Sequence, residues 1–159
     1  MLSTEEIRNL VNMKKYIQWK VKIKDKNKGS HLSASFILFS QDKNYMFEVF
    51  MRQNNHIPES FSIGIKIKTD EWSIGLFRYN WAHWEHRNKI WNEKINWAHI
   101  HSYDSDYINA GMEYDSYAEE TIEYVSFQEA QLKFFEDMNI ENYRDHFEEI
   151  ATMKDSLFN

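Results

Sequence analysis

The sequence has no cysteine, only four glycines and a single proline among its 159 residues. The missing thiols exclude disulfides, thiolate catalysis, thiolate zinc sites and iron–sulfur clusters. No run approaches the roughly 18 consecutive apolar residues of a membrane-spanning helix. The first residues lack the basic segment and apolar run of a signal peptide. The length is typical of one compact domain, so we expect a single cytoplasmic domain, residues 1–159, with no membrane partner.

Charge is distributed unevenly along the chain, whose net charge is -6. Residues 1–69 contain 12 Lys and Arg against 6 Asp and Glu, whereas residues 104–159 contain 3 against 15. The basic part could contact nucleic acid, and the acidic part could imitate nucleic acid and occupy a basic groove of another protein. Solvated faces without a binding role are the alternative interpretation.

Two periodicities predict the secondary structure. The pattern Ser3-Thr4-Glu5-Glu6 is a capping box and predicts a helix that ends near Lys15. Residues that alternate between apolar and polar then predict strands over 16–24, 31–40, 45–53, 60–68, 71–79 and 97–103. In this pattern Trp19 and Trp72 are expected in the core. The isoleucines of 60–68 and Phe61 are expected to point inward.

The remaining segments complete an α+β prediction. Residues 80–96 follow neither period, so we expect an ordered loop there, with or without a short helix. Residues 104–120 are acidic and irregular. A second capping box, Ser126 to Glu129, predicts one C-terminal helix. A second C-terminal helix is predicted over residues 141–157. The expected fold is a largely antiparallel sheet of about six strands with an N-terminal helix and two C-terminal helices.

The stretch NWAHIHSY, residues 96–103, contains the first candidate site. Strand alternation places Trp97, His99, His101 and Tyr103 on one face. Paired imidazoles can act as base and acid on a phosphodiester, because imidazole titrates near neutral pH. Additional candidates lie close by in the sequence: His83, His86, Arg78 and Arg87. Arginine could hold the developing charge of a phosphate.

Two other interpretations of these histidines stay open. Histidine beside tryptophan on a half-exposed sheet is often only a packed, hydrogen-bonded side chain. In the second interpretation, His83, His86, His99 and His101 bind a divalent metal, although no cofactor is favoured. The spacing departs from the histidine signatures of metallo-β-lactamases, histidine-triad hydrolases, two-histidine phosphoesterases and cupins. The histidines therefore predict a site without naming a known one.

The order LFRYN…HWEHRN…AHIHSY resembles the pattern of TumE-like toxins of bacterial toxin–antitoxin pairs, and of a related uncharacterised family of small mobile-element proteins. The resemblance covers about residues 74–140, including the later VSFQEAQLKFFEDMNI. The matching positions are Arg78, Tyr79, His83 or His86, His99, His101 and Tyr103. Departures are Asn80 in place of Asp, no Pro or Gly in the loop, and an acidic stretch after Tyr103.

The resemblance implies a growth-inhibiting toxin that acts on nucleic acid or nucleotides, with a cognate antitoxin as partner. A metal-independent ribonuclease or a nucleotide-modifying enzyme would fit the predicted histidine and arginine site. The alternative is a non-enzymatic inhibitor from a phage or mobile element, which would bind a host protein through the acidic residues 104–159. The sequence does not indicate an oligomeric state.

Overall fold

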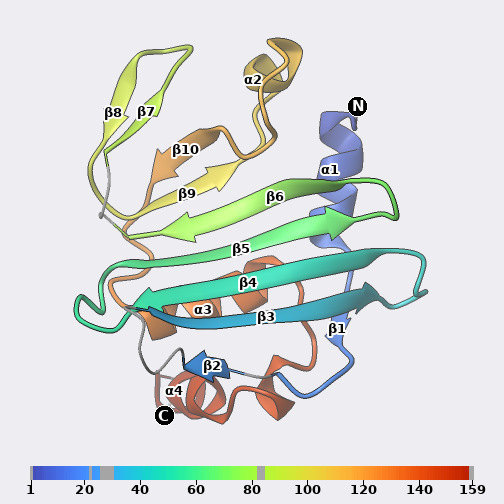
Figure 1. Ribbon diagram of the computed structural model, residues 1–159, viewed down its shortest axis with the longest axis vertical. Helices are drawn as coiled ribbons and strands as arrows, with labels where there is room; N and C mark the ends of the chain where they lie inside the picture. The colour runs from blue at the N-terminus through green and yellow to red at the C-terminus, as the bar shows by residue number, and fades with distance from the viewer. Residues whose placement is uncertain (1, 22, 26–30, 82–84, 158–159) are drawn as a thin grey trace.

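The computed structural model describes residues 2–21, 23–25, 31–81 and 85–157 (Figure 1). Its helices are α1 (Thr4–Asn12), α2 (Ser105–Asn109), α3 (Phe127–Asp137) and α4 (Glu148–Leu157), with a 3-10 helix, η1 (Tyr143–Asp145). Its strands are β1 (Lys15–Ile17), β2 (Ile23–Asp25), β3 (His31–Ser40), β4 (Met46–Asn54), β5 (Phe61–Lys68), β6 (Ser73–Asn80), β7 (His86–Asn88), β8 (Glu93–Ile95), β9 (His99–Ser102) and β10 (Tyr117–Glu120). None of the helices in these ranges is long and apolar enough to cross a membrane.

The main sheet contains eight strands in the order β1-β3-β4-β5-β6-β9-β10, with β2 paired to β3 beside β1. Every described strand pairing is antiparallel. Strands β7 and β8 form a separate hairpin at one end of the sheet (Figure 1). The predicted α+β fold, with its N-terminal helix, antiparallel sheet and two C-terminal helices, is confirmed. The sheet has more than the six strands expected.

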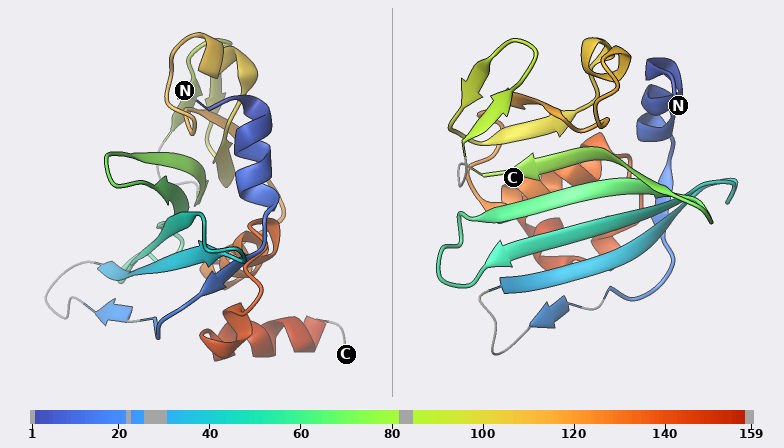
Figure 2. Two further views of the ribbon diagram at one scale, coloured as in Figure 1. Left: turned by 90° about the vertical axis from the view of Figure 1, so that its right-hand side faces the viewer. Right: turned by 45° about the horizontal axis from the view of Figure 1, so that its top comes forward.

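The helices cover one face of the sheet and leave the other open. The predicted inward residues of β5, Phe61, Ile63, Ile65 and Ile67, are all buried. They pack in one core with Ile7 and Leu10 of α1 and with Phe134 and Phe135 of α3. Figures 1 and 2 show α1, α3 and α4 behind the sheet. We call the opposite side, which faces the viewer in Figure 1, the open face.

The helix starts follow the capping patterns of the sequence. Ser3 Oγ accepts from the Glu6 backbone N–H at 3.2 Å, and Glu6 Oε2 accepts from the Ser3 backbone at 2.7 Å. At α3, Ser126 Oγ likewise accepts from the Glu129 backbone at 3.2 Å. The Glu129 carboxylate instead accepts from the backbone N–H of Val125, at 2.7 Å. The first capping box is therefore complete, and the second is shifted by one residue.

The prediction of one continuous strand over 16–24 was wrong. The prediction that Trp19 and Trp72 are buried was also wrong. Strand β1 ends at Ile17, and β2 starts at Ile23 and pairs with the other end of β3. Trp19 lies between them and is 60% exposed, while Trp72 lies in the β5–β6 turn and is 45% exposed. Alternation in the sequence continues through this break, but the backbone pairing that would bury the residues does not. The turn predicted at 25–29 lies mostly outside the described residues.

Three further segments differ from expectation. Residues 80–96 contain the β7–β8 hairpin in place of the predicted loop or short helix. Its strands are three residues long, and their buried residues are Asn88 and Ile95, so they leave no hydrophobic alternation in the sequence. Residues 104–120 are regular in part, because they contain α2 and β10. The last helix begins at Glu148, seven residues later than expected, after η1.

Lys15 joins β1 to two helices and is fully buried, at 0% exposure. Its ammonium donates to the carbonyl oxygens of Val11, Met13 and Met138, at 2.7, 2.9 and 3.0 Å. It also lies 5.0 Å from the centre of the Phe47 ring. Val11 lies in the last turn of α1, Met13 is its C-cap residue and Met138 is the C-cap residue of α3, so a single side chain satisfies acceptors that would otherwise be unpaired.

Candidate functional site

Strand register places polar side chains in two adjacent rows on the open face. One row consists of residues that pair directly across β4, β5, β6 and β9: Arg52, Ser62, Asn80 and His99. The next row contains Gly64, Arg78 and His101. Because side chains alternate along each strand, residues two apart on β6 and on β9 point to the same side. Arg78 and the two β9 histidines therefore meet on the open face.

Three imidazoles form a cluster where the β7–β8 hairpin meets β9. The ring centroids of His86 and His101 are 4.5 Å apart, and those of His99 and His101 are 4.9 Å apart. The centroids of His86 and His99 are 5.8 Å apart. His99 and His101 are 3% and 2% exposed, so most of each ring is withdrawn from solvent. The hairpin thus adds a third imidazole to the pair on the strand.

Backbone carbonyls orient the two β9 imidazoles. Nδ1 of His99 lies 2.7 Å from the carbonyl oxygen of Trp97, and Nδ1 of His101 lies 3.0 Å from that of Asp115. A carbonyl oxygen only accepts, so each Nδ1 carries the proton. In the neutral ring Nε2 then keeps its lone pair and can take a proton from a bound molecule.

His86 is oriented differently, by a buried side-chain amide. Asn88 is 0% exposed, and its amide forms two hydrogen bonds with the backbone of Ala118: Nδ2 donates to the carbonyl at 2.8 Å, and Oδ1 accepts from the N–H at 3.0 Å. Oδ1 is thereby fixed as an acceptor, so Nε2 of His86, at 3.1 Å, donates to it. His86 therefore directs one N–H toward the protein.

Arg78 lies against His101 and supplies the positive charge of the cluster. Its Nη2 is 3.3 Å from Nε2 of His101, and its Nη1 is 3.9 Å from the Asp115 carboxylate. The Arg78 side chain is 37% exposed, whereas its buried Nε has no hydrogen-bond partner among the described residues. The guanidinium therefore has donors left for an anion.

Burial lowers the pKa of all three imidazoles, because the charged form loses its hydration. For His101 the pKa falls to about 2, with the positive charge of Arg78 adding to the effect of burial. For His86 and His99 hydrogen bonds to Asn88 and Trp97 oppose the decrease. The cluster is therefore neutral at pH 7, and Arg78 is its cation.

These residues line one end of a cleft of about 620 Å³, which we call the histidine cleft. Its lining residues are His31, Arg52, Asn54, Ser60, Phe61, Ser62, Arg78, Asn80, Trp81, Glu85, His86, His99 and His101. Four imidazoles and two guanidiniums face one cavity of this size, which is large enough for a small ligand or a segment of a polymer. The arrangement suits an anion such as a phosphate.

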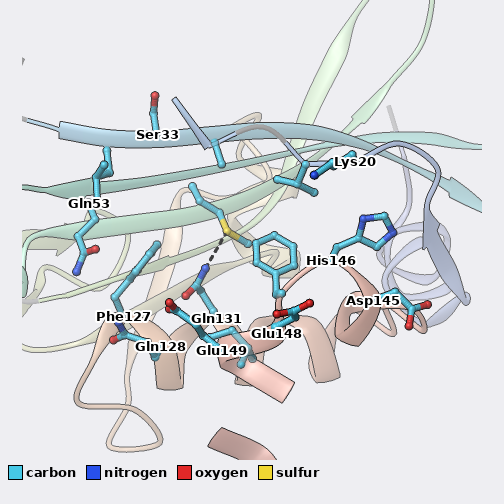
Figure 3. A pocket seen from close by; sticks show the side chains of 16 residues that line it. Lys20, Ser33, Gln53, Phe127, Gln128, Gln131, Asp145, His146, Glu148 and Glu149 are labelled. Atoms are coloured by element: carbon cyan, nitrogen blue, oxygen red, sulfur yellow. Dashed lines mark hydrogen bonds between the residues drawn. The ribbon is translucent and has the colours of Figure 1, made fainter. Parts of the chain in front are cut away.

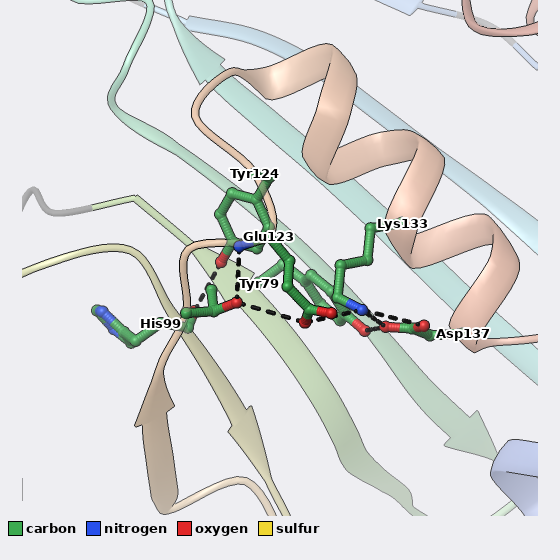
Figure 4. A network of polar contacts seen from close by, with 7 residues as sticks. Tyr79, His99, Glu123, Tyr124, Lys133 and Asp137 are labelled. Carbon is green, nitrogen blue, oxygen red and sulfur yellow. Dashed lines mark hydrogen bonds and ion pairs between the residues drawn. The ribbon is translucent and has the colours of Figure 1, made fainter. Parts of the chain in front are cut away.

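A polar network behind the sheet supports the same strands (Figure 4). The Tyr124 hydroxyl lies 2.9 Å from the carbonyl oxygens of both Asn80 and His99. Tyr79 donates to the Asp137 carboxylate at 2.5 Å, and Lys133 contacts the same carboxylate at 3.0 Å. Tyr124 therefore joins the end of β6 to the start of β9 directly behind the candidate site.

The other predicted site residues lie outside the histidine cleft or outside the described residues. Arg87 is exposed on the hairpin and contacts Asn92 and Glu85. Tyr103 packs edge-on against Phe77, with ring centroids 5.7 Å apart. Neither lines the histidine cleft. Trp97 precedes β9 and is 66% exposed, while His83 lies outside the described residues.

Sequence reasoning missed the far half of the cleft. Arg52 and His31 come from β4 and β3, and Nη2 of Arg52 lies 3.1 Å from Nε2 of His31. Alternation along 45–53 could have placed Arg52 on the outward face. Its place in the same cleft as the β9 histidines depends on the order of the strands, which alternation does not reveal.

The histidines do not form a recognisable metal site within residues 2–21, 23–25, 31–81 and 85–157. No group of three or more His, Asp or Glu side chains in these ranges is placed to hold a metal ion. The two β9 imidazoles and His86 each direct a nitrogen to a protein oxygen.

A second cavity, of about 750 Å³, lies between β3 and the C-terminal helices (Figure 3). Apolar residues such as Met51 and Phe147 line it, and Gln131 Nε2 lies 3.4 Å from the Met51 sulfur. Asp145, Glu148 and Glu149 also line it, so this cavity is unsuited to a phosphate.

The fold and the cleft define an α+β protein with an imidazole and guanidinium site on the open face of its sheet. The chain belongs to a family of unknown function (DUF6978), whose model matches residues 2–140. The match includes every strand, α1 to α3 and all lining residues of the histidine cleft. No curated protein and no solved structure matches the chain.

The lowered pKa values give a prediction for anion binding. Sulfate keeps its charge between pH 8 and 5, and its binding should raise the pKa of His99 and His86 by favouring their charged forms. Binding then takes up a proton, so affinity should increase as the pH falls, by up to about tenfold per unit. Calorimetric titration at several pH values measures this. An affinity that is constant from pH 8 to 5 would contradict it, and the His86→Gln/His99→Gln double variant should lose the dependence.

Proposed function

We propose that the protein is a metal-independent ribonuclease whose active site is the histidine cleft. One observation carries the proposal: a neutral His99, held through Nδ1, lies beside the Arg78–His101 pair in an open cavity. This combination offers a base with a free lone pair and a cation for the phosphate. The resemblance to TumE-like toxins is consistent with such an activity, and growth inhibition controlled by a cognate antitoxin is part of the proposal.

His99 has the role of a base that later acts as an acid. Its Nε2 takes the proton of a ribose 2′-hydroxyl, and the 2′ oxygen attacks the adjacent phosphorus. The bond from phosphorus to the 2′ oxygen forms as the bond to the 5′ oxygen breaks, which leaves a 2′,3′-cyclic phosphate. The proton held by His99 passes to the departing 5′ oxygen. The imidazole returns to its neutral form, and the step balances without a co-reactant.

Arg78 and His101 have complementary roles. Arg78 stabilises the negative charge that develops on the phosphorus oxygens during attack. His101, with a pKa of about 2, is too weak a base to take the proton efficiently. Its Nε2 instead contacts the Arg78 guanidinium at 3.3 Å. We therefore assign His99 the proton transfer and His101 the positioning of Arg78.

A comparison of RNA with its 2′-deoxy counterpart tests the reaction. The purified protein should cleave a fluorescently labelled single-stranded RNA and leave a 2′,3′-cyclic phosphate, because the 2′-hydroxyl is the nucleophile. The same oligonucleotide with one 2′-deoxy residue should resist cleavage after that residue only. A chelator should not change the rate. Cleavage at the deoxy position, or a product without a cyclic phosphate, would contradict the mechanism.

The alternative, an inhibitor that binds a host protein through residues 104–159, stays a prediction. Several carboxylates of this region are paired within the protein. Lys133 contacts Glu123 and Asp137, and Arg144 contacts Asp155. These pairs offset part of the acidic surface that such binding would need, so we favour the ribonuclease.

A further inference from the structure

We infer that the histidine cleft holds single-stranded RNA by two separate phosphates, one at Arg78 and one at Arg52. The inference rests on the proposed function and adds a second, non-catalytic phosphate subsite to it. Both arginines lie on the open face of the sheet and line the same cleft. Arg52 is exposed, so its guanidinium is accessible to a ligand.

The two guanidiniums point away from each other across the sheet. Arg52 on β4 reaches toward His31 on β3, with Nη2 at 3.1 Å from Nε2. Arg78 on β6 reaches in the opposite direction, toward His101 on β9. Strands β3 and β9 are four strand spacings apart in the sheet order, which is roughly 19 Å at about 4.8 Å per spacing. A single phosphate contacts one of these groups, whereas a strand with several phosphates contacts both.

The surface between the two arginines suits an unpaired nucleotide. Ser62 and Asn80 lie between them in the row that crosses the sheet, and both can form hydrogen bonds with a sugar or base. Trp81 lines the cleft beside them and packs against Phe61, with ring centroids 6.3 Å apart. A half-buried indole offers a stacking surface for a base that is free of a partner strand. This favours a single strand over a duplex.

The charge of the cleft agrees with a polyanionic ligand. Glu85 is the carboxylate among the lining residues, and it is paired on the hairpin with Lys94 at 3.0 Å and with Arg87 at 3.8 Å. Its negative charge is therefore offset locally. Asp115, at 3.9 Å from Arg78 Nη1, offsets part of the charge of Arg78 from outside the cleft lining, so Arg52 contributes most of the positive balance, and two imidazoles that gain protons would add to it.

Binding of two uncleavable probes tests the inference. Deoxythymidine monophosphate carries one phosphate, and a tetradeoxythymidylate carries several; neither has the 2′-hydroxyl that the reaction requires. We expect the tetramer to bind at least about tenfold more tightly than the monophosphate, with a slope of log affinity against log salt near -1.4, as expected for two phosphates. Arg52→Gln should weaken the tetramer about tenfold, reduce the slope to about -0.7, and leave the monophosphate within twofold.

Two comparisons keep the inference separate from the proposed function. Arg78→Gln should weaken both probes, because both use the catalytic subsite. Arg8→Gln removes one charge from exposed α1 on the other side of the sheet and should change neither. If both probes bind with one slope near -0.7 and Arg52→Gln has no effect, the second subsite is wrong and the ribonuclease proposal stands. If neither probe binds at any salt concentration, the proposed function fails and the inference with it.

Discussion

Replacement of His99 by glutamine is expected to reduce the rate of RNA cleavage by about 100- to 10,000-fold, the usual contribution of a positioned acid–base group. Glutamine is polar and of similar length, and its amide can still donate to the carbonyl oxygen of Trp97. It has no lone pair that can take and return a proton at neutral pH. The loss should therefore appear in kcat, while the affinity for an uncleavable oligonucleotide changes little.

Two matched variants show whether this loss is specific. His56→Gln changes an exposed histidine in the β4–β5 loop and should leave the rate unchanged. His101→Gln should lower the rate by releasing Arg78, but it should keep the acid limb of the pH–rate profile, because that limb belongs to His99, whose pKa is lowered by burial. If His99→Gln retains a rate within threefold of the parent protein, His99 is not the base.

Lys15→Met is expected to lower the free energy of unfolding by about 3 kcal/mol. Methionine fills much of the same space beside Phe47 but cannot donate to the carbonyls of Val11, Met13 and Met138. Each buried acceptor left without a donor costs on the order of 1 kcal/mol. Urea denaturation monitored by tryptophan fluorescence measures the change, and the slope against urea should stay the same.

The neighbouring lysine provides the control for this variant. Lys14 is 58% exposed in its side chain and contacts Glu141 at 3.5 Å. A surface pair of this kind contributes at most about 1 kcal/mol, so Lys14→Met should have a small effect. Equal stabilities for the two variants would show that the buried ammonium does not hold α1 and α3 together.

Local patterns predicted the features that form within a few residues or along a single strand. The capping box at Ser3, the strand over 31–40 and the inward face of β5 follow from spacing alone. The same alternation placed His99 and His101 on one side of a strand. These features depend on hydrogen bonds within a few residues or on a period of two, and both are visible in a sequence.

Features that depend on tertiary pairing were not visible. Arg52 lines the same cleft as the β9 histidines because β4, β5, β6 and β9 are consecutive in the sheet, and nothing local reveals that order. The burial of Lys15 was not visible either, since one of its three acceptors is the Met138 carbonyl, 123 residues further along the chain. Trp19 reads as core, but the break between β1 and β2 leaves it outside. The hairpin at 86–95 is held by the Asn88 amide and by contacts of Trp91 with Tyr107 and Tyr117, which alternation does not reveal.

The amide of Asn88 also has a consequence for self-association. By bonding both the N–H and the C=O of Ala118, it takes the place of a neighbouring peptide unit on the outermost strand of the sheet. Strand edges with unpaired backbone groups are templates for the addition of further chains and for aggregation. The side chain that orients the His86 imidazole therefore also occupies the backbone groups of Ala118, so these groups are not open to pairing with a strand of another copy.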